Sequence, residues 1–278
     1  MNKALRLDPS HAGDAFIVPE WPAPPRVRAL ITTRNGGYSR GPYAGNDSAR
    51  HDHSGNNHSG NNRLGGLNLG SGCGDSPEDV AANRALLRRR LPADPRWLHQ
   101  VHGRRVIDAA KIGAEENEPD ADASFTFERH IVCAVQMADC MPILLCDREG
   151  AAVAAAHAGW RGMASGVIEA TVAAMDLAPE RLLAYLGPAI GPNAFEVGGE
   201  VRAAFVAHDP GARSCFRRLP AARKWLGDIE SLARRRLASL GVTQVFGGGR
   251  CTFSEPEHFY SYRRDGVTGR MAALIWIE

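Results

Sequence analysis

No stretch of this sequence is apolar for long enough to cross a membrane. Its apolar runs all fall short of the roughly 18 residues that a spanning helix needs. The first residues also lack the apolar core of a secretory signal. We therefore expect a cytoplasmic protein with no membrane partner.

A strong net charge is also missing. The chain has 33 lysines and arginines against 31 acidic residues, which gives a formal net charge of +2. Proteins that bind nucleic acid by electrostatics carry a marked basic excess or patch. This balance gives no reason to expect a nucleic-acid partner.

The sequence has no CxxC pair. Its six cysteines are scattered singly, at Cys73, Cys133, Cys140, Cys146, Cys215 and Cys251. Disulfide frameworks are typical of short secreted chains, whereas isolated cysteines in a long chain are typical of reduced thiols in the cytoplasm. We expect free thiols.

What the chain does have is enough apolar sequence for a large core, with 44% hydrophobic residues among 278. Apolar runs bounded by Gly, Pro and Asp predict strands, and periodic segments between them predict helices. Strands are expected at 27–32, 105–107, 131–137, 143–147, 151–156, 182–186, 243–246 and 271–277. Helices are expected at 77–90, 163–175, 199–208 and 224–240. Adjacent strands joined by the Glu149-Gly150 turn predict a hairpin, so the fold class is α/β with a mixed sheet.

Two segments depart from this pattern. Residues 1–25 are rich in proline and are expected to form an irregular N-terminal arm. Residues 44–66 contain a tandem His-Ser-Gly-Asn-Asn repeat and have no apolar residue between Ala49 and Leu64. Such a segment cannot bury enough surface to fix a conformation, so we predict a mobile insertion without a role in the chemistry. Its histidines, which could bind a metal weakly, are His51, His53 and His58.

Cys140 and His157 form the first candidate site. Each follows or ends a predicted buried strand, where a polar side chain needs a partner. Their separation of seventeen residues fits no common local metal motif. In the segment before them, alternation puts His99 and His102 on opposite sides, so that one imidazole points into a site. Arg34, next to a glycine turn, either holds an anion or lies exposed at a hairpin tip.

Five separated motifs resemble those of a known family. They are Gln100–Gly103 (QVHG), Ala138–Cys140 (ADC), His157–Gly162 (HAGWRG), Leu186–Pro192 (LGPAIGP) and Phe259–Gly266 (FYSYRRDG), the last followed by Thr268–Arg270. Together they resemble the YfiH/YlmD family, described both as multicopper polyphenol oxidase (laccase) and as purine nucleoside phosphorylase. The resemblance covers residues 26–278. It implies one catalytic domain there, an α/β/β/α sandwich similar to the cysteine-hydrolase-like domain of cytotoxic necrotizing factor toxins.

The resemblance also implies a metal site. Family members bind one ion per chain, usually zinc with copper possible in its place, and the matching positions here are His102, Cys140 and His157. Two imidazoles and a thiolate with a fourth position open are typical of a catalytic zinc. The sequence has enough histidines for a second metal site only if those of the insertion take part. A multicopper oxidase is therefore not expected.

The activities implied are phosphorolysis of adenosine, inosine, guanosine and methylthioadenosine, and deamination of adenosine. Some bacterial members are also credited with removing L-serine from a peptidoglycan precursor. The partners would be a nucleoside and phosphate, and the protein a monomer or weak homodimer. We expect Cys140, His157 and Asp139 to be catalytic, with Asp139 either orienting an imidazole or acting only as a turn residue.

Phosphorolysis requires a site for a dianion, and guanidinium groups suit phosphate oxygens. The candidates are Arg34, Arg263 and Arg264. Arg263 and Arg264 are expected on an extended segment, where neighbours face opposite ways, so only one of them would reach the pocket. We favour Arg263.

One departure from the family concerns the pocket edge, where Ser71–Asp75 replaces a segment in which many members have a histidine. Two alternatives from other classes also stay open. One is a metal-free hydrolase in which Cys140 is the nucleophile and His157 the base. The other is a non-catalytic binding protein.

Overall fold

The protein is described by a computed structural model that covers residues 15–46, 65–113, 118–219 and 223–278. The predicted insertion at 44–66 falls mostly between these ranges. Its three histidines lie outside the described residues.

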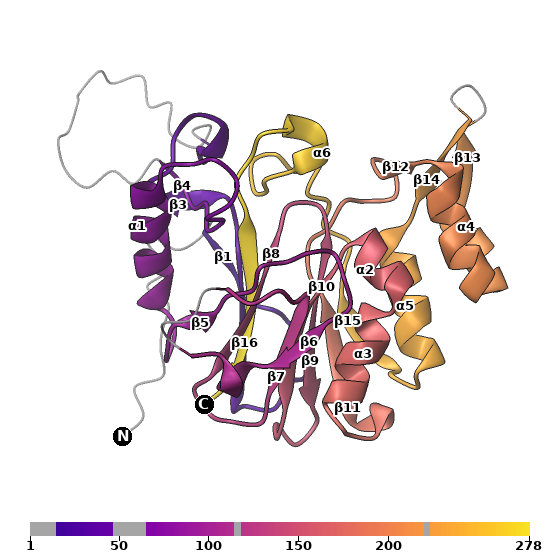
Figure 1. Cartoon of the computed structure of the whole chain (residues 1–278), viewed down its shortest axis with the longest axis horizontal. Helices are drawn as coiled ribbons and strands as arrows, with labels where there is room; N and C mark the ends of the chain where they lie inside the picture. The colour runs from indigo at the N-terminus through magenta and orange to yellow at the C-terminus, as the bar shows by residue number, and fades with distance from the viewer. Residues whose placement is uncertain (1–14, 47–64, 114–117, 220–222) are drawn as a thin grey trace.

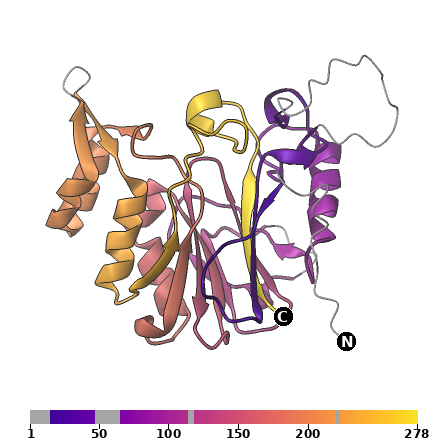
Figure 2. The ribbon, with the colours of Figure 1, turned by 180° about the vertical axis from the view of Figure 1, so that it is seen from behind.

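Two β-sheets packed face to face form the centre of the molecule, and helices cover both outer faces (Figures 1 and 2). The first sheet has the strand order β1 (Phe16–Ile17), β2 (Val27–Thr32), β16 (Met271–Ile277), β8 (Val132–Met137) and β5 (Pro95–Arg96). The second has the order β15 (Gln244–Gly247), β11 (Leu182–Leu186), β9 (Met141–Asp147), β10 (Val153–Ala158), β7 (Ala123–Thr126) and β6 (Val106–Asp108). Both sheets mix parallel and antiparallel pairs. The predicted α/β/β/α sandwich is confirmed.

Alternation along the strands divides the core into three layers. On β8, Val135 and Met137 point into the layer between the sheets, while Ala134 faces the outer layer under α1 (Pro77–Arg88). On β9, Leu144 lies between the sheets and Ile143 faces the helices on the other side. Because each sheet is buried on both faces, its strands are apolar at almost every position. This explains the continuous apolar runs in the sequence.

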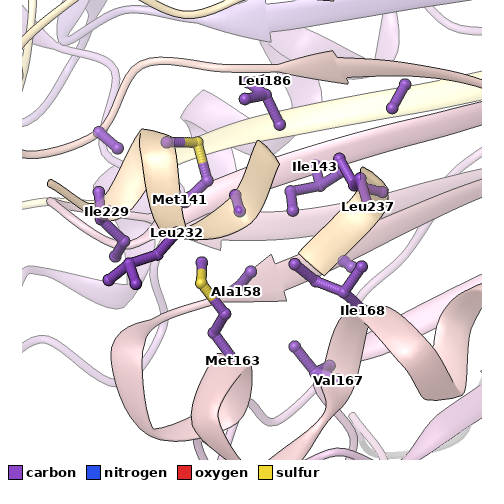
Figure 3. Close-up of a cluster of buried hydrophobic side chains, with 14 of the residues drawn as sticks. Met141, Ile143, Ala158, Met163, Val167, Ile168, Leu186, Ile229, Leu232 and Leu237 are labelled. Atoms are coloured by element: carbon purple, nitrogen blue, oxygen red, sulfur yellow. The ribbon is translucent and has the colours of Figure 1, made fainter. Parts of the chain in front are cut away.

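The helices on the second sheet close the outer layer of the core. Their bounds are α2 (Trp160–Ser165), α3 (Val167–Ala174), α4 (Gly199–His208) and α5 (Ile229–Ser239). Figure 3 shows Met163, Val167 and Ile168 meeting Ile229, Leu232 and Leu237 over the strand residues Met141 and Ile143. α2 and α3 were expected as one helix, but Gly166 adopts a left-handed conformation (φ 94°) and separates them.

Several predicted elements are confirmed at their bounds, namely the strands at 27–32, 182–186 and 271–277 and the helix at 199–208. The Glu149-Gly150 turn joins β9 and β10 as an antiparallel hairpin, with Gly150 at φ 70°. The helix at 77 begins as expected, with Ser76 accepting a hydrogen bond from the Asp79 amide. No helix in the described ranges is both long and apolar enough to cross a membrane.

The predicted helix at 224–240 is wrong in its first part. Lys224–Gly227 is strand β14, which lies between β12 (Glu196–Val197) and β13 (Phe216–Leu219) in a small third sheet. The helix begins only after Asp228, whose carboxylate accepts a hydrogen bond from the Ser231 amide. Its predicted end is confirmed, since Gly241 follows with φ 91°.

The predicted extended segment at 263–264 is also wrong. Both arginines lie in the short helix α6 (Tyr262–Asp265), which begins where Ser261 accepts a hydrogen bond from the Arg264 amide. A small two-stranded ribbon, β3 (Asn35–Gly37) and β4 (Gly65–Gly66), completes the described strands. In Figure 1, α6 lies above one end of the sandwich.

Candidate metal centre

Three side chains that can ligate a metal meet at this end of the sandwich. The donor atoms of His102, Cys140 and His157 all lie within 4.8 Å of one another, and no second group of three such residues occurs in the described ranges. His102 lies in the loop after β5, Cys140 in the turn from β8 to β9, and His157 in β10. The Cys140 Sγ atom is 3.8 Å from His102 Nε2. The three residues that the resemblance implied therefore lie together.

The β9–β10 hairpin explains how Cys140 and His157 come together. In its register His157 lies opposite Pro142 and Ala158 opposite Met141, directly beside the turn that holds Cys140. Sequence spacing could not show this proximity, because the hairpin closes the separation of seventeen residues.

Asp122 contacts both histidines, the ring of His157 and the backbone of His102. Its fully buried carboxylate accepts hydrogen bonds from the His157 ring at Nδ1 (2.8 Å) and from the backbone amides of His102 (2.9 Å) and Gly103 (2.6 Å). His102 has φ 58°, a left-handed conformation that is uncommon outside glycine, and the bonds from Asp122 hold this turn in place. Since Nδ1 of His157 is used, its Nε2 is the atom left for a ligand.

The electrostatics of the cluster favour a thiolate. Burial alone would raise the pKa of the Cys140 thiol, but the charge of His157 and hydrogen bonds from both imidazoles outweigh it and lower the pKa to about 6. Burial opposes protonation of His157, but the Cys140 thiolate and Asp122 raise its pKa to about 9. Burial likewise acts against ionisation of Asp122, yet its bonds to His157 and the two amides lower its pKa.

The donor set fits a single metal ion. In a tetrahedral zinc site with bonds near 2.0 Å to nitrogen and 2.3 Å to sulfur, neighbouring donor atoms lie about 3.5 Å apart. The observed separation of 3.8 Å between Sγ and Nε2 is close to that value. Gly159 leaves room for this arrangement, since a Cβ atom there would lie 2.8 Å from the Cys140 sulfur. Imidazole and thiolate ligands suit zinc and copper alike.

The cluster lines a pocket of about 680 Å³. Aromatic side chains in its wall are Trp160, Phe195 and Tyr262, and the arginines there are Arg161, Arg263 and Arg270. The pocket thus combines metal-ligating side chains, aromatic faces and cationic groups. Such a lining suits a flat, polar small molecule.

Of the two roles considered for Asp139, orienting an imidazole or acting as a turn residue, its hydrogen bonds are those of a turn residue. Its carboxylate accepts hydrogen bonds from the Thr252 hydroxyl and the Arg263 amide, each at 2.6 Å, and its carbonyl accepts one from the Ile190 amide. It therefore ties the turn before Cys140 to α6 and to the loop after β11. The contact to an imidazole is made instead by Asp122.

The three predicted phosphate-binding arginines separate into two groups. Arg34 donates to the carbonyls of Ala44 and Pro256, and its guanidinium lies 4.9 Å from the Tyr260 ring. Every guanidinium nitrogen of Arg264 is bonded to a backbone carbonyl or to Asp265. Neither residue lines the pocket. Only Arg263 does, with one hydrogen bond from its guanidinium to the Glu196 carbonyl.

His99 and His102 do not alternate across a regular strand. Both line the pocket, and His99 pairs at the surface with Asp120 at 2.6 Å, which raises the pKa of its imidazole. Sequence reasoning missed Asp122. The available signal was a carboxylate directly before the buried strand β7, where an unpaired charge would be costly.

The fold and the site together define an α/β/β/α protein with a candidate His-Cys-His metal centre in an open pocket. The chain belongs to the family described as multi-copper polyphenol oxidoreductase laccase, whose pattern matches residues 28–278. The resemblance to YfiH proteins is confirmed by sequence relatives that match almost the whole chain. Purine nucleoside phosphorylase YfiH of Escherichia coli is 50% identical over 94% of this chain and 98% of its own. A purine nucleoside phosphorylase of Pseudomonas aeruginosa is 48% identical over 95% and 99%.

Solved structures agree with this assignment. A protein of Neisseria meningitidis is 46% identical and superposes with a TM-score of 0.84, covering 95% of this chain and 99% of that one. YlmD from Geobacillus stearothermophilus is 29% identical, with a TM-score of 0.76 over 91% and 93%.

Proposed function

We propose that this protein is a zinc-dependent purine nucleoside phosphorylase that uses one ion held by His102, Cys140 and His157. The observation that carries the proposal is the cluster of these three side chains in the wall of one pocket. The names of the relatives support the reaction class. The proposed substrates are adenosine, inosine, guanosine and methylthioadenosine, with deamination of adenosine as a second reaction. We place the enzyme in the cytoplasm, as a monomer or weak homodimer.

Each part of the pocket has a role in this proposal. A divalent ion at the cluster would supply Lewis acidity beside the bound substrate. The aromatic side chains offer faces on which a purine can stack. Asp122 holds His157 in the tautomer that presents Nε2, and Asp139 keeps the Cys140 turn in contact with α6. Arg263 is the predicted phosphate ligand that lines the pocket.

The number of sites bears on the laccase description. Oxidation by several copper ions would need several ligand groups, and the described residues offer one. The proposal is therefore phosphorolysis and not oxidation of polyphenols.

Metal analysis combined with a product assay tests the proposal. Protein purified without added metal should contain about one equivalent of zinc per chain, and inosine with phosphate should give hypoxanthine and ribose 1-phosphate. Cys140→Ser should lose both metal and activity. Cys251→Ser, a half-buried cysteine outside the cluster, should lose neither. Full metal content in Cys140→Ser, or hypoxanthine release that does not depend on phosphate, would contradict the proposal.

A second candidate is a metal-free cysteine hydrolase, including one that edits a peptidoglycan precursor. The low pKa of Cys140 next to the charged His157 favours it, since a thiolate beside an imidazolium is the usual nucleophilic pair. Such an enzyme would be inactivated by alkylation but not by chelation, whereas the zinc enzyme would lose activity on chelation. No turnover of any nucleoside at micromolar enzyme would instead favour a binding protein.

A further inference from the structure

Three arginines face the pocket from three different segments. Arg161 lies in α2, Arg263 in α6, and Arg270 directly precedes β16. Within the described part of the chain, none of the three is in an ion pair with a carboxylate. Unpaired guanidinium groups gathered on one pocket are unusual, because charged side chains of like sign repel unless a ligand neutralises them.

The acidic residues in the pocket wall do not compensate this charge. They are Glu118 and Asp139. Glu118 is paired with Arg84 at 2.9 Å, and the Asp139 oxygens accept from Thr252 and from the Arg263 amide. The net charge that the wall presents to a ligand is therefore positive, before any metal ion is counted.

Arg161 is the most available of the three. Its guanidinium lies 4.6 Å from the ring of Trp160, and it has no hydrogen bond to any described residue. Contact with an aromatic face leaves the N–H groups at the edge of the guanidinium plane free to bind two oxygens of one anion.

The Arg270 guanidinium makes two hydrogen bonds but keeps donors that have no hydrogen-bond partner among the described residues. One terminal nitrogen donates to the carbonyls of Thr268 and Gly269, while Nε and the other terminal nitrogen have no partner in the described ranges. Its side chain lies against Gly70, where a Cβ atom would be 2.7 Å from Arg270 Cγ. The glycine lets this arginine lie along the pocket wall.

We propose that Arg161 and Arg270, together with Arg263, form the phosphate subsite of the pocket. Taking phosphate as the anion rests on the proposed function. Two or three guanidinium groups match the charge and the oxygen geometry of a dianion. Arg34 and Arg264 are not part of this subsite, because backbone carbonyls and Asp265 use their donors.

Calorimetric titration with inorganic phosphate tests the subsite directly. The proteins compared are wild type, Arg161→Ala, Arg270→Ala and Arg161→Lys, at equal metal content verified by elemental analysis. We expect each alanine variant to bind phosphate about tenfold more weakly or worse. Arg161→Lys should fall between, since lysine keeps the charge but loses the fork. Arg218→Ala is the control, because this exposed arginine on β13 does not line the pocket.

Kinetics provide the second readout. In the alanine variants the KM for phosphate should rise about tenfold or more, while the KM for inosine and the deamination of adenosine change little, since deamination needs no dianion. Wild-type phosphate affinity in both alanine variants overturns the subsite. So does the absence of phosphate binding by the wild type at millimolar concentration, with or without hypoxanthine.

The subsite and the proposed function fail in distinguishable ways. If the wild type binds phosphate, the variants lose it and inosine is never cleaved, the subsite stands and the phosphorylase does not. If inosine cleavage depends on phosphate but both variants keep the wild-type KM for it, the phosphorylase stands and the subsite does not.

Discussion

Asp122 shows how much of the centre depends on one buried carboxylate. It supports His157 through the ring and His102 through the backbone. In Asp122→Asn, an NH2 group replaces one of the two accepting oxygens. This donor would then point at an N–H group, which is also a donor. We expect the affinity for zinc to fall about 10- to 100-fold, the usual effect of removing such a support.

Chelator competition measures this affinity. Asp120→Asn is the matched control, because Asp120 makes a similar contact at the surface with His99, which is not in the cluster. Circular dichroism should show both variants folded. Wild-type zinc affinity in Asp122→Asn would mean that the loop holds His102 without this carboxylate.

Gly159 gives a purely steric test of the centre. Its backbone (φ −61°, ψ 159°) is open to any residue, but a Cβ atom would lie 2.8 Å from Cys140 Sγ and 3.2 Å from His102. Gly159→Ala should therefore lower zinc content severalfold or more while the protein stays folded. Gly199→Ala, where a Cβ atom meets nothing within 4 Å, should bind zinc as the wild type does. Equal zinc content in the two variants would show that the cluster can shift without loss.

The pH dependence of alkylation reports on Cys140. The pKa of its thiol is lowered to about 6, and the thiolate is the reactive form. In metal-stripped protein, iodoacetamide should react at a rate that is nearly constant above pH 7 and falls as the pH drops through 6. Burial raises the pKa of Cys133 and of Cys146 to about 12, so mass spectrometry should find these two unmodified. A midpoint near pH 8.5 at Cys140, about the value of a free thiol, would contradict the electrostatics.

Among the elements, the start of α5 depends on Asp228. Its carboxylate accepts from both the amide and the hydroxyl of Ser231. Asp228→Ala should lower the free energy of unfolding by about 0.5–2 kcal/mol, the usual value of an N-cap. Asp228→Ser should recover most of the loss, and urea titration measures both. If Asp228→Ala is as stable as the wild type, packing alone determines where the helix starts.

The elements also show what local sequence can and cannot reveal. Strands β2, β11 and β16 have their predicted bounds because they are largely apolar and are followed by a polar residue or a glycine. Lys224–Gly227 reads locally as part of a helix, yet it pairs with strands on either side. The pairing with β12 joins residues far apart in the sequence and leaves no periodic signal. The short α6 escaped prediction for a similar reason, because the Asp139 carboxylate bonds to its Arg263 amide.

The same limit applies to the candidate site. Cys140 and His157 stood out because they end apolar runs, and His102 was found through a motif shared with a family. Asp122 was missed, although it touches two of the three ligands. Arg161 was quoted in a motif but was given no role. Only the fold shows that Arg161 lines the pocket and that, apart from the Trp160 ring, its guanidinium has no hydrogen-bond or ion-pair partner in the described ranges.

At the scale of the whole molecule, the insertion can be tested by removal. Gly45 and Gly65, near the two ends of the insertion, lie next to each other, since a Cβ atom on Gly45 would be 3.0 Å from the Gly65 carbonyl oxygen. A short link can therefore span the gap. Replacing Ala49 to Asn62 by a Gly-Ser link should leave the melting temperature nearly unchanged and turnover within a few-fold. Loss of zinc on this replacement would show that His51, His53 or His58 contributes to binding.

Strand β16 lies between β2 and β8 in the first sheet, although it follows every other strand along the chain. During synthesis, β2 and β8 leave the ribosome before β16 does. Until Met271–Ile277 has left the exit tunnel, β2 can pair only with β1 and β8 only with β5, and nothing joins the two halves of the sheet. Ile31 and Val135, which both lie opposite Ala273, then lack their contact with β16. The first sheet therefore closes only after β16 has emerged, and until then the chain exposes apolar surface and strand edges that favour aggregation.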